Sequence, residues 1–155
     1  MGKLAIDCIN RPKDLTKIAK AVYSVLEQED NLKAEITFMN EEDMKDLNFR
    51  TRGIDKVTDV LSYPSLDNIK GKILRKEDNQ TVLDGRYIFI GSIVLCNQKI
   101  KEQAKEYQHS TEVEKRYLII HGLMHLMGYD HMSEEDKKEM RAKEKEALAL
   151  LGVED

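Results

Sequence analysis

The sequence predicts a single compact α/β (α+β) domain over residues 1–155, and three observations support this fold class. A length of 155 residues is typical of one domain and is sufficient to bury a substantial core. Segments with the apolar or alternating pattern of strands are followed along the chain by segments with helical spacing. No internal repeat or linker divides the chain. We therefore expect one folding unit.

A strand and a helix are predicted first. Residues 4–10 have strand character, and they precede Pro12, which is favourable at an early helical position. The apolar residues that follow have the spacing of one helix face, at Leu15, Ile18, Ala19, Val22 and Leu26.

A second strand, a second helix and a third strand come next. Residues 34–39 alternate Ala, Ile and Phe with Glu, Thr and Met, which is the period of a half-buried strand. Asn40 is a favourable N-cap for a helix in which Met44 and Leu47 face inward. Residues 57–63 favour the third strand, which the following proline stops.

The rest of the chain predicts one strand and three helices. Residues 65–86 are polar and turn-like, and they favour a mobile loop or an added hairpin. Residues 87–96 are strongly apolar and predict the fourth strand. The helices are expected at residues 97–108, from near Ser110 onwards, and from Ser133 to about Leu151.

Three of the four histidines follow the pattern H-x-x-x-H-x-x-G-x-x-H. His121 and His125 are four residues apart, so they share one face of a helix. Gly128 can adopt the left-handed conformation that ends a helix, which lets the chain fold back and present His131. Three neutral imidazole nitrogens and one open position describe a catalytic zinc site rather than a closed structural one. We predict one zinc ion per chain, with nickel or another divalent metal as the alternative.

The residue after the first histidine argues against a peptidase. Zinc peptidases with paired helical histidines carry a glutamate there as general base. This chain has Gly122, which cannot transfer a proton. The four methionines in and near this region are expected to pack the core around the site: Met124, Met127, Met132 and Met140. The charged residues of the last helix are expected to form a solvated face.

A second group of residues predicts an anion-binding turn before the third strand. Arg50, Arg52 and Lys56 surround Gly53. Arginine binds phosphate through two parallel hydrogen bonds, and a glycine turn lets backbone amides approach an anion. A charged surface turn is the alternative. A metal site in the same small domain favours the phosphate interpretation, because metal and arginine together can stabilise a phosphodiester undergoing cleavage.

These two groups of residues resemble the YbeY family of bacterial endoribonucleases, also called ribosomal RNA maturation factors. The similarity extends over residues 34–131 and includes His109 and Ser110. It implies a mixed four-stranded sheet flanked by about five helices, one zinc ion held by the three histidines, and a functional arginine at Arg52. The family commonly has an aspartate after the glycine of the fourth strand. This chain has Ser92, which can hydrogen bond but carries no charge at neutral pH.

The resemblance also implies an activity. It implies cleavage of single-stranded RNA in small-subunit ribosomal RNA maturation and ribosome quality control, with the small subunit and its proteins as partners. In this hypothesis His121, His125 and His131 hold a zinc ion, with an open position at which it lowers the pKa of bound water to about 7. Arg52, with Arg50 or Lys56, would bind the phosphate and stabilise its charge. Asp130 either orients an imidazole or a water, or forms part of a turn. The nucleophile is water or the ribose 2′-hydroxyl.

Two other functions remain open from the sequence: a non-catalytic ribosome-assembly factor with a structural zinc, and a general metal-dependent hydrolase. A net charge of −4 excludes a globally basic nucleic-acid binder and leaves room for a local positive groove. No apolar run approaches the roughly 18 residues of a membrane span. Cys8 and Cys96 lie far apart, and we expect two reduced thiols in a cytoplasmic protein.

Overall fold

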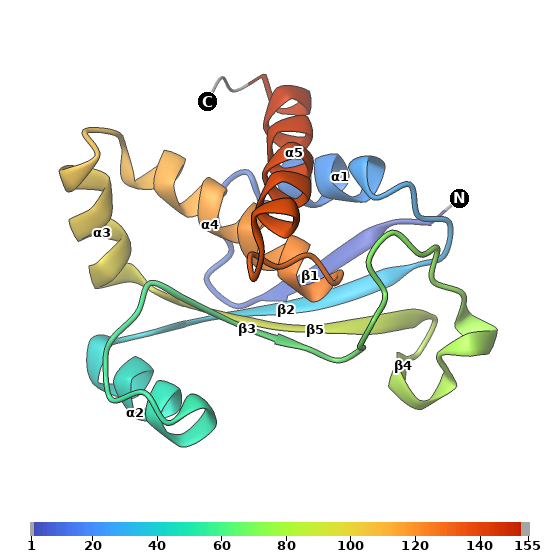
Figure 1. The fold of residues 1–155 in the computed structure, drawn as a ribbon, viewed down its shortest axis with the longest axis horizontal. Helices are drawn as coiled ribbons and strands as arrows, with labels where there is room; N and C mark the ends of the chain where they lie inside the picture. The colour runs from blue at the N-terminus through green and yellow to red at the C-terminus, as the bar shows by residue number, and fades with distance from the viewer. Residues whose placement is uncertain (1, 153–155) are drawn as a thin grey trace.

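The computed structural model describes residues 2–152, and its mixed sheet lies between two unequal helical layers (Figure 1). The elements are β1 (Leu4–Cys8), α1 (Leu15–Val25), β2 (Leu32–Met39), α2 (Glu41–Arg52), β3 (Val60–Pro64), β4 (Leu83–Asp84), β5 (Tyr87–Cys96), α3 (Asn97–Glu106), α4 (Thr111–Leu126) and α5 (Glu134–Leu150). Helices α1, α4 and α5 cover one face of the sheet, and α2 packs on one end of the other face (Figure 1).

Within the described residues the sheet contains five strands. Their order is β1-β2-β5-β3, and β4 also pairs with β5. The strands β1, β2 and β5 are parallel, whereas β3 and β4 run antiparallel to β5. The predicted α/β class and mixed sheet are confirmed. The expected number of four strands is corrected by β4, a two-residue strand in a polar segment without a strand-like pattern.

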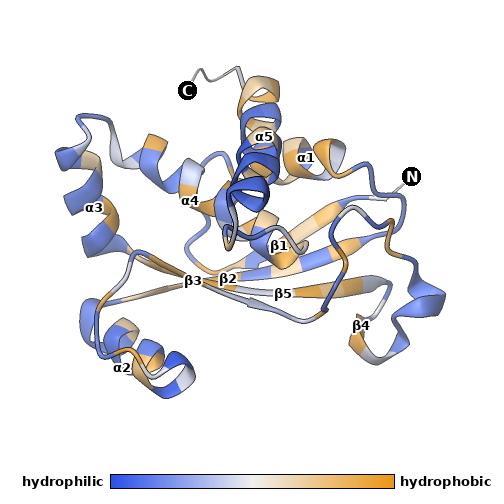
Figure 2. Ribbon diagram, in the orientation of Figure 1, coloured by the Kyte–Doolittle hydropathy of each residue, from blue (hydrophilic) through white to orange (hydrophobic). Residues whose placement is uncertain are grey.

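The central strand β5 contributes side chains to both faces of the sheet. Ile93 and Leu95 belong to the larger core, which α1, α4 and α5 complete. Val94 and Cys96 belong to a smaller core with Met44 of α2. Apolar residues accordingly run along β1 and β5, between the helical layers (Figure 2). The face of β5 toward α4 therefore supports the histidine motif, and the opposite face supports α2.

The predicted N-caps hold the helices that carry the motifs. The Asn40 side chain accepts a hydrogen bond from the backbone N–H of Asp43 at 2.8 Å, at the start of α2. The hydroxyls of Ser110 and Ser133 each accept one from an N–H three residues later, at 3.1 Å. Each bond satisfies a donor that the first helical turn would otherwise leave unpaired.

The segment 65–86 is mostly irregular, with a short hairpin at its end where β4 pairs with β5, and it is anchored to the body of the protein. Its residues Ile69 and Leu74 are buried in the larger core. The side-chain amide of Gln28 donates to the carbonyl of Lys72 and accepts from the N–H of Leu74, both at 2.8 Å. Of the two predicted alternatives, the added hairpin is present at the end of the segment, and the rest is a loop held by these contacts.

One predicted core residue is exposed. Met124, Met127 and Met140 are buried as expected, whereas Met132 is 86% exposed. Met132 lies in the turn between the histidine motif and α5, where its side chain has no facing layer. Both cysteines are free, with Cys96 buried and Cys8 half-buried. None of the helices in the described part of the chain is both long and apolar enough to cross a membrane.

Candidate metal centre

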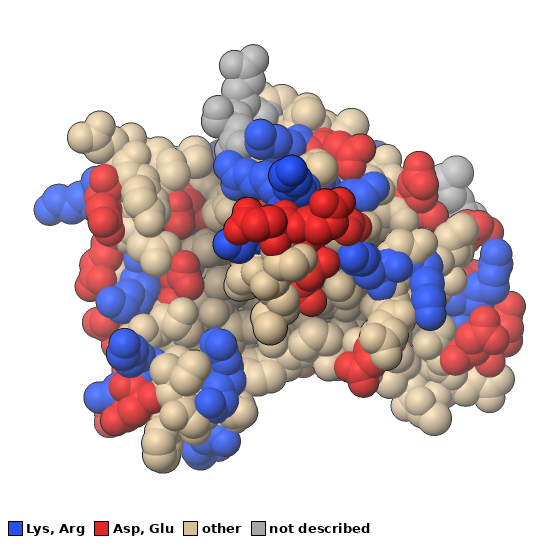
Figure 3. Space-filling view, viewed as in Figure 1, with Lys and Arg blue, Asp and Glu red and all other residues tan. Residues whose placement is uncertain are grey.

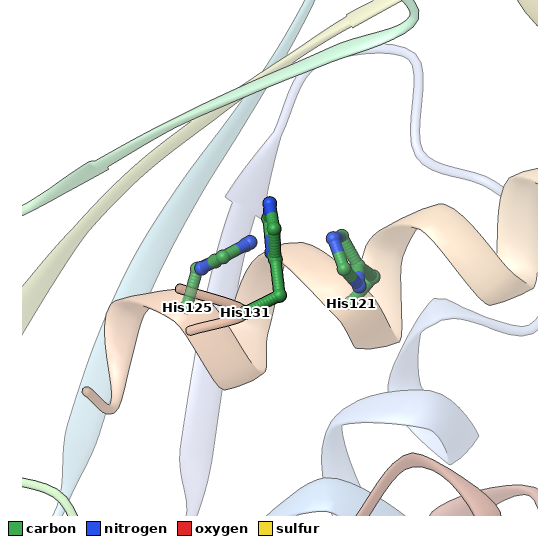
Figure 4. A group of neighbouring side chains, drawn as sticks. All are labelled: His121, His125 and His131. Carbon is green, nitrogen blue, oxygen red and sulfur yellow. The ribbon is translucent and has the colours of Figure 1, made fainter. Parts of the chain in front are cut away.

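The three histidines of the motif converge at the C-terminal end of α4. His121 and His125 project from the same side of the helix, and His131 returns from the following turn to face them as the third corner of a triangle (Figure 4). One ring nitrogen from each lies within 4.8 Å of the others. The ring centroids of His121 and His125 are 4.7 Å apart, and that of His131 is 6.0 and 5.2 Å from them. This arrangement can hold one metal ion.

Hydrogen bonds orient the two helical rings. Nδ1 of His121 lies 2.6 Å from Oε2 of Glu144 on α5. Nδ1 of His125 lies 2.9 Å from the backbone carbonyl of Tyr129. A carboxylate and a carbonyl both accept, so each Nδ1 carries the proton and each Nε2 keeps a lone pair for a metal. Neutral imidazole nitrogens fit zinc, and also nickel, copper or iron.

The environment of His125 favours its neutral form. Burial lowers the pKa of His125 below its ordinary value of 6.5, and the neighbouring His121 and His131 lower it further. A metal ligand must be neutral to offer its lone pair. The packing therefore prepares His125 for coordination at a pH where an exposed histidine is partly protonated.

Two glycines define the shape of the motif. Gly128 has φ = +96°, and a Cβ at this position would lie 2.7 Å from the backbone nitrogen of Lys70. Only glycine combines this conformation with this contact, which permits the turn toward His131. Gly122 faces β5, where a Cβ would lie 2.9 Å from Ile93. Position 122 therefore points away from the histidines, and a side chain there would meet the sheet before it met a substrate.

A cleft of about 530 Å³ joins the histidines to the arginine of the second motif. Arg52, the last residue of α2, and residues of β3 form one wall, and the three histidines form the other. Gly53 has φ = +71° and ends α2, so the chain turns there toward β3. Basic side chains gather over α2 and along α5 on the viewed face, with acidic side chains beside both (Figure 3).

The other predicted phosphate-binding residues lie outside this lining. Arg50 is exposed and pairs with Asp46 at 2.9 Å, one turn earlier on α2. The side chain of Lys56 is exposed, and its backbone carbonyl accepts a hydrogen bond from buried Asn48 at 2.9 Å. Asn48 therefore fixes the loop between α2 and β3, a role that the sequence did not suggest.

Neither of the two remaining predicted residues has a hydrogen bond to a histidine ring among the described contacts. Ser92 lies on the face of β5 opposite α4, where its hydroxyl is 3.4 Å from Glu35 of β2. Side chains alternate along a strand, so Ser92 shares the side of Val94, which packs beneath α2. The structure thus does not bring Ser92 to the metal centre. Asp130 accepts from the N–H of Met132 at 3.3 Å, a bond within the turn.

Glu144 is the residue of this centre that sequence analysis missed. It was included in the solvated face expected for the last helix, although its side chain is 3% exposed. Its position gives a signal that the sequence analysis did not use, because Glu144 lies four residues after Met140 and shares the helix face of Ala147 and Leu148. The packing of α5 shows that this face is buried, with Glu144 included.

Comparison with known proteins gives one consistent result. The family model described as "Endoribonuclease YbeY" matches residues 4–152. A Clostridium perfringens protein named Endoribonuclease YbeY is 39% identical over 91% of this chain and 89% of its own length. A Thermoanaerobacter protein of the same name is 40% identical, over 96% and 92%.

A solved structure shares the fold. The solution structure of TM1509 from Thermotoga maritima matches 98% of this chain and 92% of its own with a TM-score of 0.56, at 21% identity. The sequence resemblance is thereby confirmed: the chain belongs to the YbeY family of endoribonucleases.

Proposed function

We propose that this protein is a zinc-dependent endoribonuclease that cleaves single-stranded RNA and acts in small-subunit ribosomal RNA maturation and ribosome quality control. The observation that carries the proposal is the cleft in which the histidine cluster faces Arg52. Its family membership supports an RNA substrate. In this proposal the protein acts in the cytoplasm, and its partner is the small ribosomal subunit.

The histidines and the arginine of the cleft have different roles in this proposal. His121, His125 and His131 would hold a zinc ion, which when bound would supply a Lewis acid for a phosphoryl oxygen and lower the pKa of water to about 7. Arg52 donates hydrogen bonds to the phosphate and stabilises the negative charge that develops during cleavage. Gly122 leaves the protein without a carboxylate base at the peptidase position, so water activation rests on the metal centre.

Substrate selection follows from the shape and charge of the cleft. An unpaired strand can bend to bring one phosphate to the end of α4, whereas a stiff A-form duplex holds its phosphates on a fixed surface. Binding led by phosphate contacts is sensitive to salt and weakly selective for bases. Selection of a particular ribosomal RNA site then depends on the ribosomal proteins around it.

A cleavage assay with defined RNA tests this function. Protein stripped of metal and protein reloaded with one equivalent of Zn²⁺ are compared on one end-labelled strand, on its duplex, on the matching DNA and on a peptide. We expect zinc-dependent cleavage of the single-stranded RNA alone. Equal cleavage with and without metal would contradict the proposal, and cleavage of DNA or peptide at a similar rate would indicate a general hydrolase. A 2′,3′-cyclic phosphate end would identify the ribose hydroxyl as nucleophile, and a simple phosphate end would identify water.

A further inference from the structure

Glu144 is a buried carboxylate on α5, the helix that crosses the metal-binding end of α4. Its side chain is 3% exposed, and Oε2 lies 2.6 Å from Nδ1 of His121. A glutamate is almost never fully buried unless a partner compensates for its lost hydration. The pair with His121 supplies that partner and joins α5 to the ligand set.

Aromatic and cationic groups complete the surroundings of this pair. Arg141 lies one turn before Glu144, with its Nη1 3.7 Å from Oε1 of the carboxylate. The same nitrogen lies 3.2 Å from the hydroxyl of Tyr117, whose ring stacks on His121 at a centroid distance of 6.0 Å and an angle of 22°. The imidazole of His121 is therefore held along its edge by Glu144 and across its face by Tyr117.

We propose that Glu144 is a positioning residue that sets the metal affinity of this centre. A neutral imidazole can carry its proton on either nitrogen, and only one tautomer leaves Nε2 available. By accepting the Nδ1–H bond, Glu144 holds His121 in that tautomer and fixes the rotation of its ring before metal arrives. A carboxylate behind a ligating histidine also makes the imidazole a stronger donor.

The two helical histidines differ in the group that accepts the hydrogen bond from Nδ1. His125 donates to the neutral carbonyl of Tyr129, whereas His121 donates to an acidic side chain. Glu144 thereby adds a negative charge next to a set of three neutral ligands, which favours a divalent cation. Glu144 lies on α5, which begins at Glu134, so the helix that follows the third ligand along the chain carries the partner of the first.

Two variants of Glu144 and one control separate this role from a general effect on folding. Glu144→Gln keeps the shape and removes the charge, and Glu144→Ala removes the acceptor. Glu146→Gln is the matched control, because Glu146 lies on the same helix, is exposed and pairs only loosely with Lys143 at 3.5 Å. Zinc affinity is measured by competition with a chelator, and metal-free unfolding is measured on the same samples. We expect affinity to fall about 10- to 100-fold in the Glu144 variants and to stay unchanged in the control.

A second readout reports the tautomer directly. In metal-free protein, ¹⁵N shifts of the His121 ring are expected to show the proton on Nδ1, and to show a mixture of tautomers in Glu144→Gln. A purely structural glutamate would lower the melting temperature without changing either the tautomer or the affinity, and that result would overturn the inference. The inference depends on the metal role of the proposed function and not on RNA cleavage. Wild-type protein that binds no zinc refutes both, whereas zinc binding with wild-type affinity in Glu144→Gln refutes only the role of Glu144.

Discussion

The two walls of the cleft are built in different ways. On the histidine wall, His121 and His125 are half-buried and hydrogen-bonded to groups that packing holds in place. On the arginine wall, Arg52 is an exposed side chain at the last turn of a helix that covers only one end of the sheet. The first wall is organised for a small ion with strict geometry, and the second can adjust to a flexible phosphate. Substitutions on the two walls should therefore produce separable effects.

The largest effect is expected on the histidine wall. His121→Ala removes a ligand and takes the 2.6 Å hydrogen bond from the buried Glu144 carboxylate, which keeps only the longer pair with Arg141 among the contacts described, so both metal binding and stability should decrease. We expect bound zinc to fall from one equivalent to near zero and RNA cleavage to fall by about 10³-fold or more, because metal assistance contributes several kcal/mol to phosphoryl chemistry. Elemental analysis and the cleavage assay measure the two consequences.

The fourth histidine provides the control for this variant. His109 pairs with buried Glu114 at 2.6 Å, at the start of α4 and outside the cluster. His109→Gln keeps a donor for that carboxylate and should retain one zinc ion. Loss of zinc from His109→Gln, or full zinc content in His121→Ala, would show that the cluster is not the metal site.

The next effect concerns the arginine wall alone. Arg52→Ala should reduce cleavage by about 10²-fold, the usual consequence of removing one donor that stabilises transition-state charge. Because Arg52 is exposed, zinc content should stay at one equivalent and the melting temperature should change little. Arg52→Lys should recover part of the activity, since a lysine keeps the charge and loses the paired geometry. A large fall in melting temperature in Arg52→Ala would mean that the two walls are not independent.

A third effect concerns stability rather than charge. Gly128→Ala places a side chain at φ = +96° and at 2.7 Å from the backbone of Lys70. We expect a loss of about 2 kcal/mol, or roughly 4–8 °C in melting temperature, together with weaker zinc binding because the turn to His131 shifts. Gly71→Ala is the matched control, with φ = +76° and open space around the added Cβ. Equal losses in the two variants would show that backbone conformation alone, and not the contact with Lys70, limits position 128.

These contrasts also indicate which features the sequence could predict. The histidine cluster depends on spacing within eleven residues, and spacing along a helix translates directly into geometry. The α/β class follows from patterns that are equally local. The partner of His121 comes from α5, 23 residues away, and its identity depends on how two helices cross. The position of Ser92 depends on which face of β5 meets α4, and the bulge in the pairing of β2 with β5 complicates that register.

The smallest effect is expected for Arg50, and it tests whether the RNA-binding surface extends beyond Arg52. Arg50 was predicted to bind substrate together with Arg52, but it pairs with Asp46 and lies outside the cleft lining. An exposed i,i+4 pair contributes little to stability. Arg50→Ala should therefore change cleavage by less than about threefold and leave the salt dependence of RNA binding nearly constant. Arg52→Ala should reduce the slope of log K against log salt by about 0.7, the value for one phosphate contact on a single strand. An equal reduction in Arg50→Ala would show that the RNA backbone continues from the cleft across the outer face of α2.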